Sequence, residues 1–502
     1  MDRAGDAFMA DEHHAPQAEA ARPGRDFAIP RSLYYVVGKI FFGIGQIVLI
    51  KVLTSTLKAS EIGKYYLLMS VVSLMSLVFI NPIYMYLARH FVEWHRTGVG
   101  WTMARRFILY VGAVALVAGC VAAILGRSGV LPMEGLLLAL VPALVFCTTV
   151  STVPNELYNL IGRMGFFNVM VNIELWGRVG FITAVFLFLP HAALTVAGGL
   201  ALWGVVMSAA AAVILYLLTR RRPSAEPAEA PVVDPRAVFE YAWPFAISIG
   251  LYWCQSDGYR ITLQFAGSVD SVGLFVVAFS LGATFMVAID SLVHQIYLPG
   301  YYQEIAGASE EGYRRAWESY ARNVVGIFVP CACFIACGGP FLARWILHSE
   351  YWGLGVYAAF GAFAQLFRIF SSIVCNGIYA YKKTSSLLLP NLVGAVAALF
   401  LVFLAGRFDP IIGAGGALVF SYFLVSAGLT RKFTRLSGAR LPIDVVLKSL
   451  ALVAPVCLGL VAAGLFGFAR SLPLNLLTLA FGGLALLAIL YRTSKNLFTA
   501  RA

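Results

Sequence analysis

The sequence has little charge and lacks the motifs on which most enzymes depend. Only 12% of its 502 residues are charged, whereas 60% are hydrophobic. It contains no glycine-rich nucleotide-binding loop, which argues against direct use of ATP. It also contains no Ser-His-Asp arrangement and no group of metal ligands that would indicate catalysis. We therefore expect a protein that is not an enzyme and that needs neither a cofactor nor a metal ion.

Cysteines are also absent from the polar segments of the sequence. All eight lie in apolar segments, so the sequence has no framework for disulfide bonds. Residues 1–31 lack the apolar core and the cleavage site of a signal peptide. We expect this segment to be a disordered cytoplasmic tail.

Long apolar runs dominate the rest of the sequence, from Ser32 to Tyr491. A bilayer core about 30 Å thick is crossed by about 20 helical residues, because each residue adds about 1.5 Å. The sequence therefore predicts an all-α polytopic membrane protein with about 14 transmembrane helices. The predicted spans are 32–53, 65–86, 106–126, 135–161, 167–189, 192–218, 238–265, 271–298, 323–345, 353–379, 385–405, 411–430, 443–468 and 473–491.

Positive charge is distributed unevenly between the two sides of these spans. An even number of spans places both termini on one side, which holds 25 of the 37 Lys and Arg residues. The positive-inside rule makes that side cytoplasmic. The net charge of +12 thus comes from short membrane flanks, which argues against a nucleic-acid partner. The other side holds five cations, namely Lys58, Lys64, Arg127, Arg407 and Arg470.

A polar segment at 219–237 divides the chain after six predicted spans. It is rich in proline, alanine and charge, which is typical of a linker. We expect an N-lobe over 32–218, a C-lobe over 238–430, and two further helices with a cytoplasmic tail over 431–502.

A weak internal repeat supports this division. Ile62-Gly63 and Val272-Gly273 open similar stretches that are offset by 210 residues. An offset of six spans preserves orientation, so the lobes would be related by an axis along the membrane normal. Chance similarity between apolar helices is the alternative explanation.

The segment 303–321 carries aromatic residues at helical spacing beside two arginines. Tyr313, Trp317 and Tyr320 recur on one helix face. This pattern predicts an interfacial amphipathic helix between the eighth and ninth spans.

Several ionisable residues lie within the predicted spans, where charge is costly and usually faces a wet cavity or a bundle interior. Glu174 and Arg178 are four residues apart, and Asp257 and Arg260 are three apart. These spacings place each pair on one helix face, so a purely structural role is open for both pairs. Both halves contribute charges, and we hypothesise a polar cavity between the lobes.

Three stretches of the sequence, 51–74, 241–282 and 340–363, together resemble the Wzx-type polysaccharide flippases of the multidrug/oligosaccharidyl-lipid/polysaccharide exporter superfamily. The first carries Glu61 before Gly63-Lys64-Tyr65, and the second an aromatic-x-x-Pro opening followed by Asp and Arg. In that family the Asp and Arg are often adjacent, whereas here Gly258-Tyr259 separates them. The third stretch is similar to the end of the ninth span and the acidic-Tyr turn of the family.

The resemblance implies two six-helix lobes facing a central cavity, with two additional C-terminal helices. It implies translocation of undecaprenyl-pyrophosphate-linked oligosaccharides across the bacterial inner membrane by alternating access. Such cargo supplies surface polysaccharides, for example O-antigen, lipopolysaccharide or exopolysaccharide. The implied partners are the polyprenyl-pyrophosphate-linked glycan and membrane lipids. Polysaccharide polymerase and chain-length machinery are candidate protein partners, and we expect a functional monomer.

The candidate site residues fall into three chemical groups. Lys39 and Arg368 have no acid nearby on their own helix face, which makes them better candidates to meet an anionic substrate than the paired cations; a partner on another helix is the alternative. The candidates for the pyrophosphate are Lys39, Arg178, Arg260 and Arg368; those for the sugars are Gln46, Asn172, Trp176, Trp253, Gln255 and Asn376; those for coupling to protons or sodium are Glu174, Asp257 and Asp290.

Three alternatives remain open from the sequence. A lipid II flippase would share the lobes and an anionic lipid substrate. A cation-coupled multidrug exporter of the same superfamily would prefer an acidic interior. A polysaccharide polymerase generally needs a large outward loop, whereas every outward loop here has about ten residues or fewer.

Overall fold

The computed structural model describes residues 31–129, 135–160, 164–188, 196–220, 233–305, 308–381 and 383–498. These residues form helices and turns, with no β-strand among them. The first helix begins at Arg31, so the expected tail lies almost wholly outside the described residues. Most of the expected linker at 219–237 also lies outside them.

The described residues form fourteen continuous helical stretches, which agrees with the number of predicted spans. Twelve are built on a single α-helix: α1 (Arg31–Thr56), α4 (Gly100–Arg127), α5 (Gly135–Leu160), α6 (Met164–Phe188), α7 (Val196–Arg220), α10 (Val269–Ile305), α11 (Glu310–Ile346), α12 (Ala358–Ala380), α13 (Leu388–Ala405), α14 (Pro410–Ser437), α15 (Ile443–Leu465) and α16 (Leu472–Phe498). Short 3-10 turns precede three of them: η4 (Ser349–Tyr357), η5 (Thr384–Leu387) and η6 (Phe468–Arg470).

The other two stretches each contain a π-helical turn. The first runs through α2 (Ala59–Leu74), η2 (Met75–Ile80) and α3 (Asn81–Arg96), and the second through α8 (Pro235–Trp253), η3 (Cys254–Gly258) and α9 (Tyr259–Ala266). Pro82 is the second residue after the first π turn. Because proline lacks an N–H group and clashes with the carbonyl four residues earlier, it favours a widened turn at this point.

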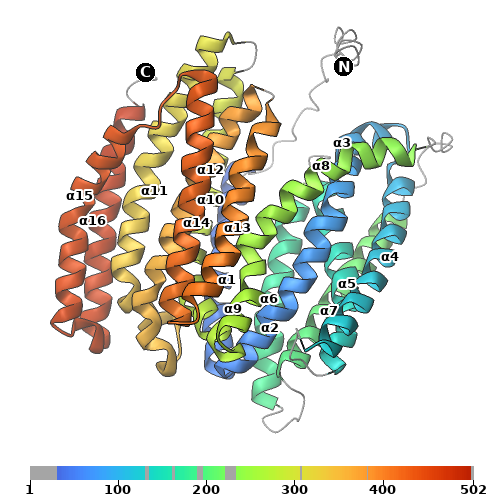
Figure 1. Ribbon diagram of the computed structural model, residues 1–502, viewed down its shortest axis with the longest axis horizontal. Coiled ribbons are helices and arrows are strands. Elements are labelled where there is room, and N and C mark those ends of the chain that lie inside the picture. The colour runs from blue at the N-terminus through green and yellow to red at the C-terminus, as the bar shows by residue number, and fades with distance from the viewer. Residues whose placement is uncertain are drawn as a thin grey trace, which may run out of the picture.

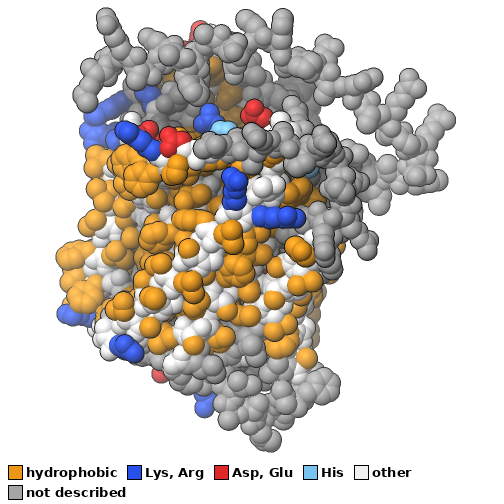
Figure 2. Space-filling model, turned by 90° about the vertical axis from the view of Figure 1, so that its right-hand side faces the viewer, with side chains coloured by type: hydrophobic (Ala, Val, Ile, Leu, Met, Phe, Trp, Pro, Cys, Tyr) orange, Lys and Arg blue, Asp and Glu red, His pale blue; other side chains and the backbone are white. Residues whose placement is uncertain are grey.

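The surface has the character of a membrane protein. Eleven helical stretches among the described residues are long and apolar enough to cross a membrane. Figure 2 shows a broad hydrophobic surface, with most of the visible Lys and Arg side chains near its upper and lower ends. Phe408 and Leu465 are 92% and 85% exposed, which is unfavourable in water but ordinary for side chains that face lipid. The predicted class, an all-α polytopic membrane protein, is confirmed.

The helices form two groups that meet along a boundary (Figure 1). Helices α3–α7 pack on one another in the first group, and α10–α14 do so in the second. At the boundary α1 contacts both α6 and α10, and α8 contacts both α3 and α13. Helices α15 and α16 lie outside this core, where they pack on α11.

The predicted internal repeat appears in the structure as a reciprocal contact between α2 and α10. A Cβ atom on Gly63 would lie 2.1 Å from the carbonyl oxygen of Val269, and one on Gly273 would lie 1.9 Å from that of Ala59. The two glycines are 210 residues apart, and so are the two carbonyl partners. This reciprocity indicates an approximate two-fold relation between the halves, as a parallel repeat requires. The contact lies at the end of the bundle that contains the turn after Thr56, which we call the distal end.

The prediction of a separate interfacial helix at 303–321 is wrong. Helix α10 continues to Ile305, and α11 begins at Glu310 and runs without a break to Ile346. Each has 37 residues, or about 55 Å, which exceeds the thickness of a bilayer core. Trp317 is 1% exposed, and its Nε1 donates a hydrogen bond to the Ile373 carbonyl at 2.9 Å. The aromatic face therefore packs on α12 instead of lying on a membrane surface.

Candidate functional site

The candidate site consists of ionisable side chains on α6, η3, α9, α10 and α12, near the boundary between the two helix groups. The three acids and three arginines among them retain between 14% and 28% side-chain exposure. They are therefore shielded from bulk solvent without being sealed in the core. We call these six residues the charge track: Glu174, Arg178, Asp257, Arg260, Asp290 and Arg368.

Arg260 connects the second half of the chain to the first. The π turn η3 leads directly into α9. Asp257 in η3 and Arg260 in α9 therefore lie on the same side, with Asp257 Oδ1 2.6 Å from Arg260 Nη1. The same nitrogen donates to Ser70 Oγ on α2 at 3.3 Å. The guanidinium carbon lies 5.1 Å from the ring centroid of Tyr66, also on α2. The ion pair and the cation–π contact together offset much of the cost of placing this charge within the membrane.

Arg368 has an acidic partner after all, on a neighbouring helix. Asp290 of α10 lies 3.7 Å from Arg368 Nη2 and 2.7 Å from His294 Nδ1. Arg368 also donates to Gln365 on its own helix and, at 3.5 Å, to Tyr252 Oη on α8. Arg368 thus contacts its own helix and two others. A change at this position therefore alters contacts with both α8 and α10.

Arg178 has the loosest ion pair of the three arginines. Glu174 lies one turn earlier on α6, with its Oε1 3.9 Å from Arg178 Nη2. The guanidinium also covers the ring of Trp203 on α7, at 4.7 Å from the centroid. Its buried Nε has no hydrogen-bond partner among the described residues. This donor is available to an incoming acceptor such as a phosphate oxygen.

Two tyrosines lie near the ion pairs. Tyr66 lies within electrostatic reach of both Arg178 and Arg260. Tyr422 on α14 lies within reach of both Asp257 and Arg368. The charge track thus has members on α6 in the first group and on α10 and α12 in the second.

Trp253, Gln255 and Asn376 do not face this track with free polar groups. Trp253 Nε1 donates to the Ser70 carbonyl and to Ser73 Oγ, both at 3.0 Å. Gln255 is 2% exposed and donates to carbonyls of α8 and α13. Asn376 is 8% exposed and lies within the second group, where it donates to a tyrosine hydroxyl of α11. Their assignment to sugar binding stays a prediction.

Trp176 and Lys39 lie at the contact between α1 and α6. Trp176 stacks on Phe41 with ring centroids 4.7 Å apart, and its buried Nε1 has no described hydrogen-bond partner. Both rings line a cavity of about 470 Å³, together with Asn172. Lys39 follows Gly38 of the same cavity wall and is partly buried. This aromatic and amide surface is suited to a sugar face, and it shares helix α6 with Arg178, which lies two residues after Trp176.

Trp253 gives a direct test of whether its role is structural. Because its indole N–H joins α8 to α2, Trp253→Phe removes both hydrogen bonds while keeping an aromatic ring. We expect a loss of about 0.5–1.5 kcal/mol of stability per hydrogen bond, seen as a lower melting temperature in detergent. Transport per folded molecule should stay near the wild-type level, and a selective loss of transport at unchanged stability would contradict this role.

Sequence reasoning left out several members of this site. The sequence places His294 four residues after Asp290 on one helix face, but His294 was not among the candidate site residues. Tyr252, Tyr66 and Ser70 carry no such signal. They reach the arginines only because α2 and α8 lie against neighbouring helices.

Comparison with known proteins identifies the fold that carries this site. No protein-family model matches the chain, and no curated protein matches its sequence. Among solved structures, the lipid II flippase MurJ in an inward closed conformation matches 93% of this chain and 99% of its own, with a TM-score of 0.67 and 11% identity. An inward-facing multidrug resistance MATE transporter of the MOP superfamily matches 82% and 99%, with a TM-score of 0.61 and 10% identity. A MOP superfamily transporter from Pyrococcus furiosus matches 81% and 94%, with a TM-score of 0.54 and 11% identity.

The chain therefore has the fold of MOP superfamily transporters. At these identities the similarity concerns the fold alone. The match to the flippase extends over more of the chain than the matches to the other two transporters.

Proposed function

We propose that this protein is a flippase that moves an undecaprenyl-pyrophosphate-linked oligosaccharide across the bacterial inner membrane for surface polysaccharide synthesis. The observation that carries the proposal is the charge track, in which three arginines from both helix groups lie within a transporter fold. Alternating access would present this track first to one side of the membrane and then to the other.

The arginines suit a pyrophosphate because a guanidinium binds phosphate oxygens through two parallel hydrogen bonds. Each arginine of the track already has a carboxylate partner. A substrate phosphate that takes the guanidinium leaves the carboxylate without its counter-ion. That carboxylate then binds a proton or a sodium ion more readily. We propose that Asp257, Asp290 and Glu174 couple ion binding to substrate binding in this way.

A drug exporter for organic cations is less well supported by the same residues. Three arginines would repel a cationic drug unless all three stayed neutralised by their acids. Lipid II is the nearer alternative, because it shares an anionic lipid carrier and its flippase shares this fold. The two flippase substrates differ in the group beyond the pyrophosphate, and only their transport distinguishes them.

The membrane potential favours the proposed direction of transport. Moving one charge across the membrane yields about 2.3 kcal/mol per 100 mV. A pyrophosphate with two negative charges that moves outward from an inside-negative cell would gain roughly twice that amount. The protein therefore needs no nucleotide for net export.

The test is a strain that lacks this protein, in which surface glycan and cytoplasmic-side lipid-linked intermediates are measured together. The proposal predicts loss of a surface glycan and accumulation of its finished lipid-linked repeat unit. Accumulation of lipid II with cell lysis would favour the alternative. Normal surface glycan without any accumulated intermediate, in a strain without a paralogue, would overturn both.

A further inference from the structure

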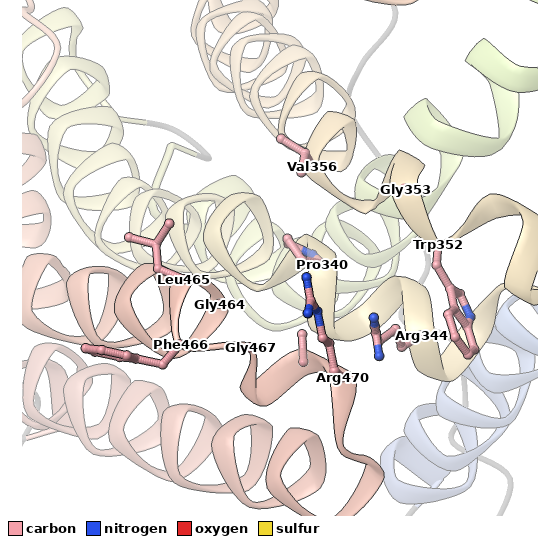
Figure 3. Close-up of a pocket in the computed structure, with 11 residues that line it drawn as sticks. Pro340, Arg344, Trp352, Gly353, Val356, Gly464, Leu465, Phe466, Gly467 and Arg470 are labelled. Carbon is pink, nitrogen blue, oxygen red and sulfur yellow. The ribbon is translucent and has the colours of Figure 1, made fainter.

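A second cationic feature lies at the distal end, away from the charge track. A cavity of about 360 Å³ opens between α11, η4, α15 and η6. Figure 3 shows Arg344 extending from α11 and Arg470 from the turn before α16, with Trp352 on the far side of Arg344. Both arginines line this cavity.

An apolar groove continues from this cavity along the helices. The groove has a volume of about 880 Å³ and lies between α11, α12 and α15. It shares part of its wall with the arginine cavity, so the two form one continuous space; the shared residues are Pro340, Val356, Gly464, Leu465 and Ala469.

The groove has the length of a lipid chain. Its wall on α15 runs from Leu450 to Leu465, or about 22 Å along the helix axis. One leaflet of a bilayer core is about 15 Å thick, so the groove accepts a chain that starts at the distal surface. Its wall consists of apolar side chains and the three cysteines Cys333, Cys337 and Cys457.

The two arginines lack the carboxylate partners that the three arginines of the charge track have. Neither forms an ion pair with an acidic residue among those described. Arg344 instead lies over the Trp352 ring, with its guanidinium carbon 4.8 Å from the centroid. This end of the protein holds few cations by the sequence, so two unpaired arginines in one cavity stand out.

The backbone holds Arg470 at the mouth of the groove. Gly467 has a φ of +77°, a conformation that favours glycine, and it reverses the chain after α15. Arg470 N–H then donates to the Gly467 carbonyl at 2.8 Å. The turn places the side chain back over the cavity, where it can act together with Arg344.

Snorkelling alone does not account for this arrangement. An arginine near a helix end ordinarily extends its charge to the membrane surface on its own. Here two guanidinium groups share a cavity, where like charges repel, and both lie at the end of an apolar groove. A single anion with an attached hydrocarbon chain would satisfy both features.

We propose that this space binds one anionic phospholipid of the leaflet at the distal end. Arg344 and Arg470 bind its phosphate, and an acyl chain fills the groove. Such a lipid would join α15 to α11 and α12, on the outside of the transport core. The proposal does not depend on the identity of the transported substrate.

The test measures lipid retention by the full-length protein. The protein is reconstituted in nanodiscs of phosphatidylglycerol and phosphatidylcholine, extracted in mild detergent, and examined by native mass spectrometry. We expect the wild type to retain one phosphatidylglycerol, and the Arg344→Gln/Arg470→Gln double variant to retain it at least about fivefold less.

The matched control is the Arg127→Gln/Arg407→Gln double variant. It removes the same charge from the same end, and Arg407 also lies over an aromatic ring, at 4.2 Å. This control should retain phosphatidylglycerol like the wild type. Equal loss in both double variants, or no loss in either, would overturn the proposal.

The groove is tested separately with a bulky residue on α15. Ala454 lines the groove and is exposed, so Ala454→Trp fills the groove without entering the core. Ala451→Trp places the same ring on an exposed position of α15 outside the groove lining. Only Ala454→Trp should reduce lipid retention.

Two other occupants give distinct outcomes that would overturn the proposal. If inorganic phosphate raises the melting temperature through Arg344 and Arg470 while no phospholipid is retained, the cavity is a site for free phosphate. If protein from native membranes carries the lipid-linked glycan here instead, the groove belongs to the transport path.

Discussion

We expect that replacing Arg368 with glutamine reduces the proposed export of the lipid-linked glycan by about tenfold to 150-fold. This range corresponds to the loss of one charge-assisted hydrogen bond to the substrate, about 1.5–3 kcal/mol. The change also frees Asp290, which then keeps only His294 within ion-pair distance among the described residues. The measurement is restoration of surface glycan in a strain lacking the protein, normalised to the amount of variant in the membrane.

The matched control for this variant is Arg315→Gln. Arg315 forms an ion pair with Glu311 at 2.7 Å and is 71% exposed, on the part of α11 that precedes the predicted ninth span. Its loss removes the same charge and the same kind of pair without touching the charge track, so export should remain close to wild type. If Arg368→Gln and Arg315→Gln have equal effects, Arg368 does not belong to the substrate site.

Replacing Gly273 with valine produces the second large effect, through the conformation of the protein. Its Cβ would lie 1.9 Å from the Ala59 carbonyl, so α2 and α10 can no longer meet at the distal end. Overpacking of this kind costs about 1–3 kcal/mol. The population of the conformation with a closed distal end should therefore fall by about fivefold to 150-fold. Because the proposed alternating access needs this closure, we expect export to fall by a similar factor.

The separation of the two helices can be measured directly. Spin labels at positions 58 and 268, in the turns before α2 and α10, would report the distal distance in a variant without native cysteines. Gly273→Val should lengthen that distance. Gly459→Val is the control, because a Cβ on Gly459 meets nothing within 4 Å. An unchanged distance with unchanged export would show that this crossing does not gate transport.

The membrane fold could be predicted from the sequence because it depends on local composition. A run of about 20 apolar residues has few alternatives to a spanning helix, since its backbone must satisfy its own hydrogen bonds. The glycine repeat was also visible, because Gly63 and Gly273 open similar helices at a fixed offset. The sequence could not show that Gly63 lies against the backbone at the start of α10 and Gly273 against the backbone at the start of α2.

The partners of the buried charges could be predicted only where they lie on one helix. The spacing of Asp257 and Arg260 was sufficient to place them together, and the structure gives 2.6 Å. Arg368 was expected to lack an acid on its own helix face, but Asp290 reaches it from α10. That contact depends on how α10 packs against α12, which no local pattern specifies.

The segment 303–321 was misread for a related reason. Its amphipathic pattern is compatible with a membrane surface and equally with a protein surface. Ser309 caps the start of α11 by accepting a hydrogen bond from the Gly312 N–H, and the helix then continues into the membrane. The apolar face, with Trp317, had a tertiary partner that the sequence did not reveal.

The most direct measurement is translocation by the purified protein in liposomes under a membrane potential. Undecaprenyl-pyrophosphate-linked oligosaccharide would be placed in one leaflet, and its arrival in the other measured by a membrane-impermeant glycosidase. Our account predicts rapid translocation by the wild type, strong reduction in Arg368→Gln and normal rates in Arg315→Gln. Translocation no faster than in protein-free liposomes, with the protein folded and inserted, would contradict the assignment of this chain as a flippase for lipid-linked glycans.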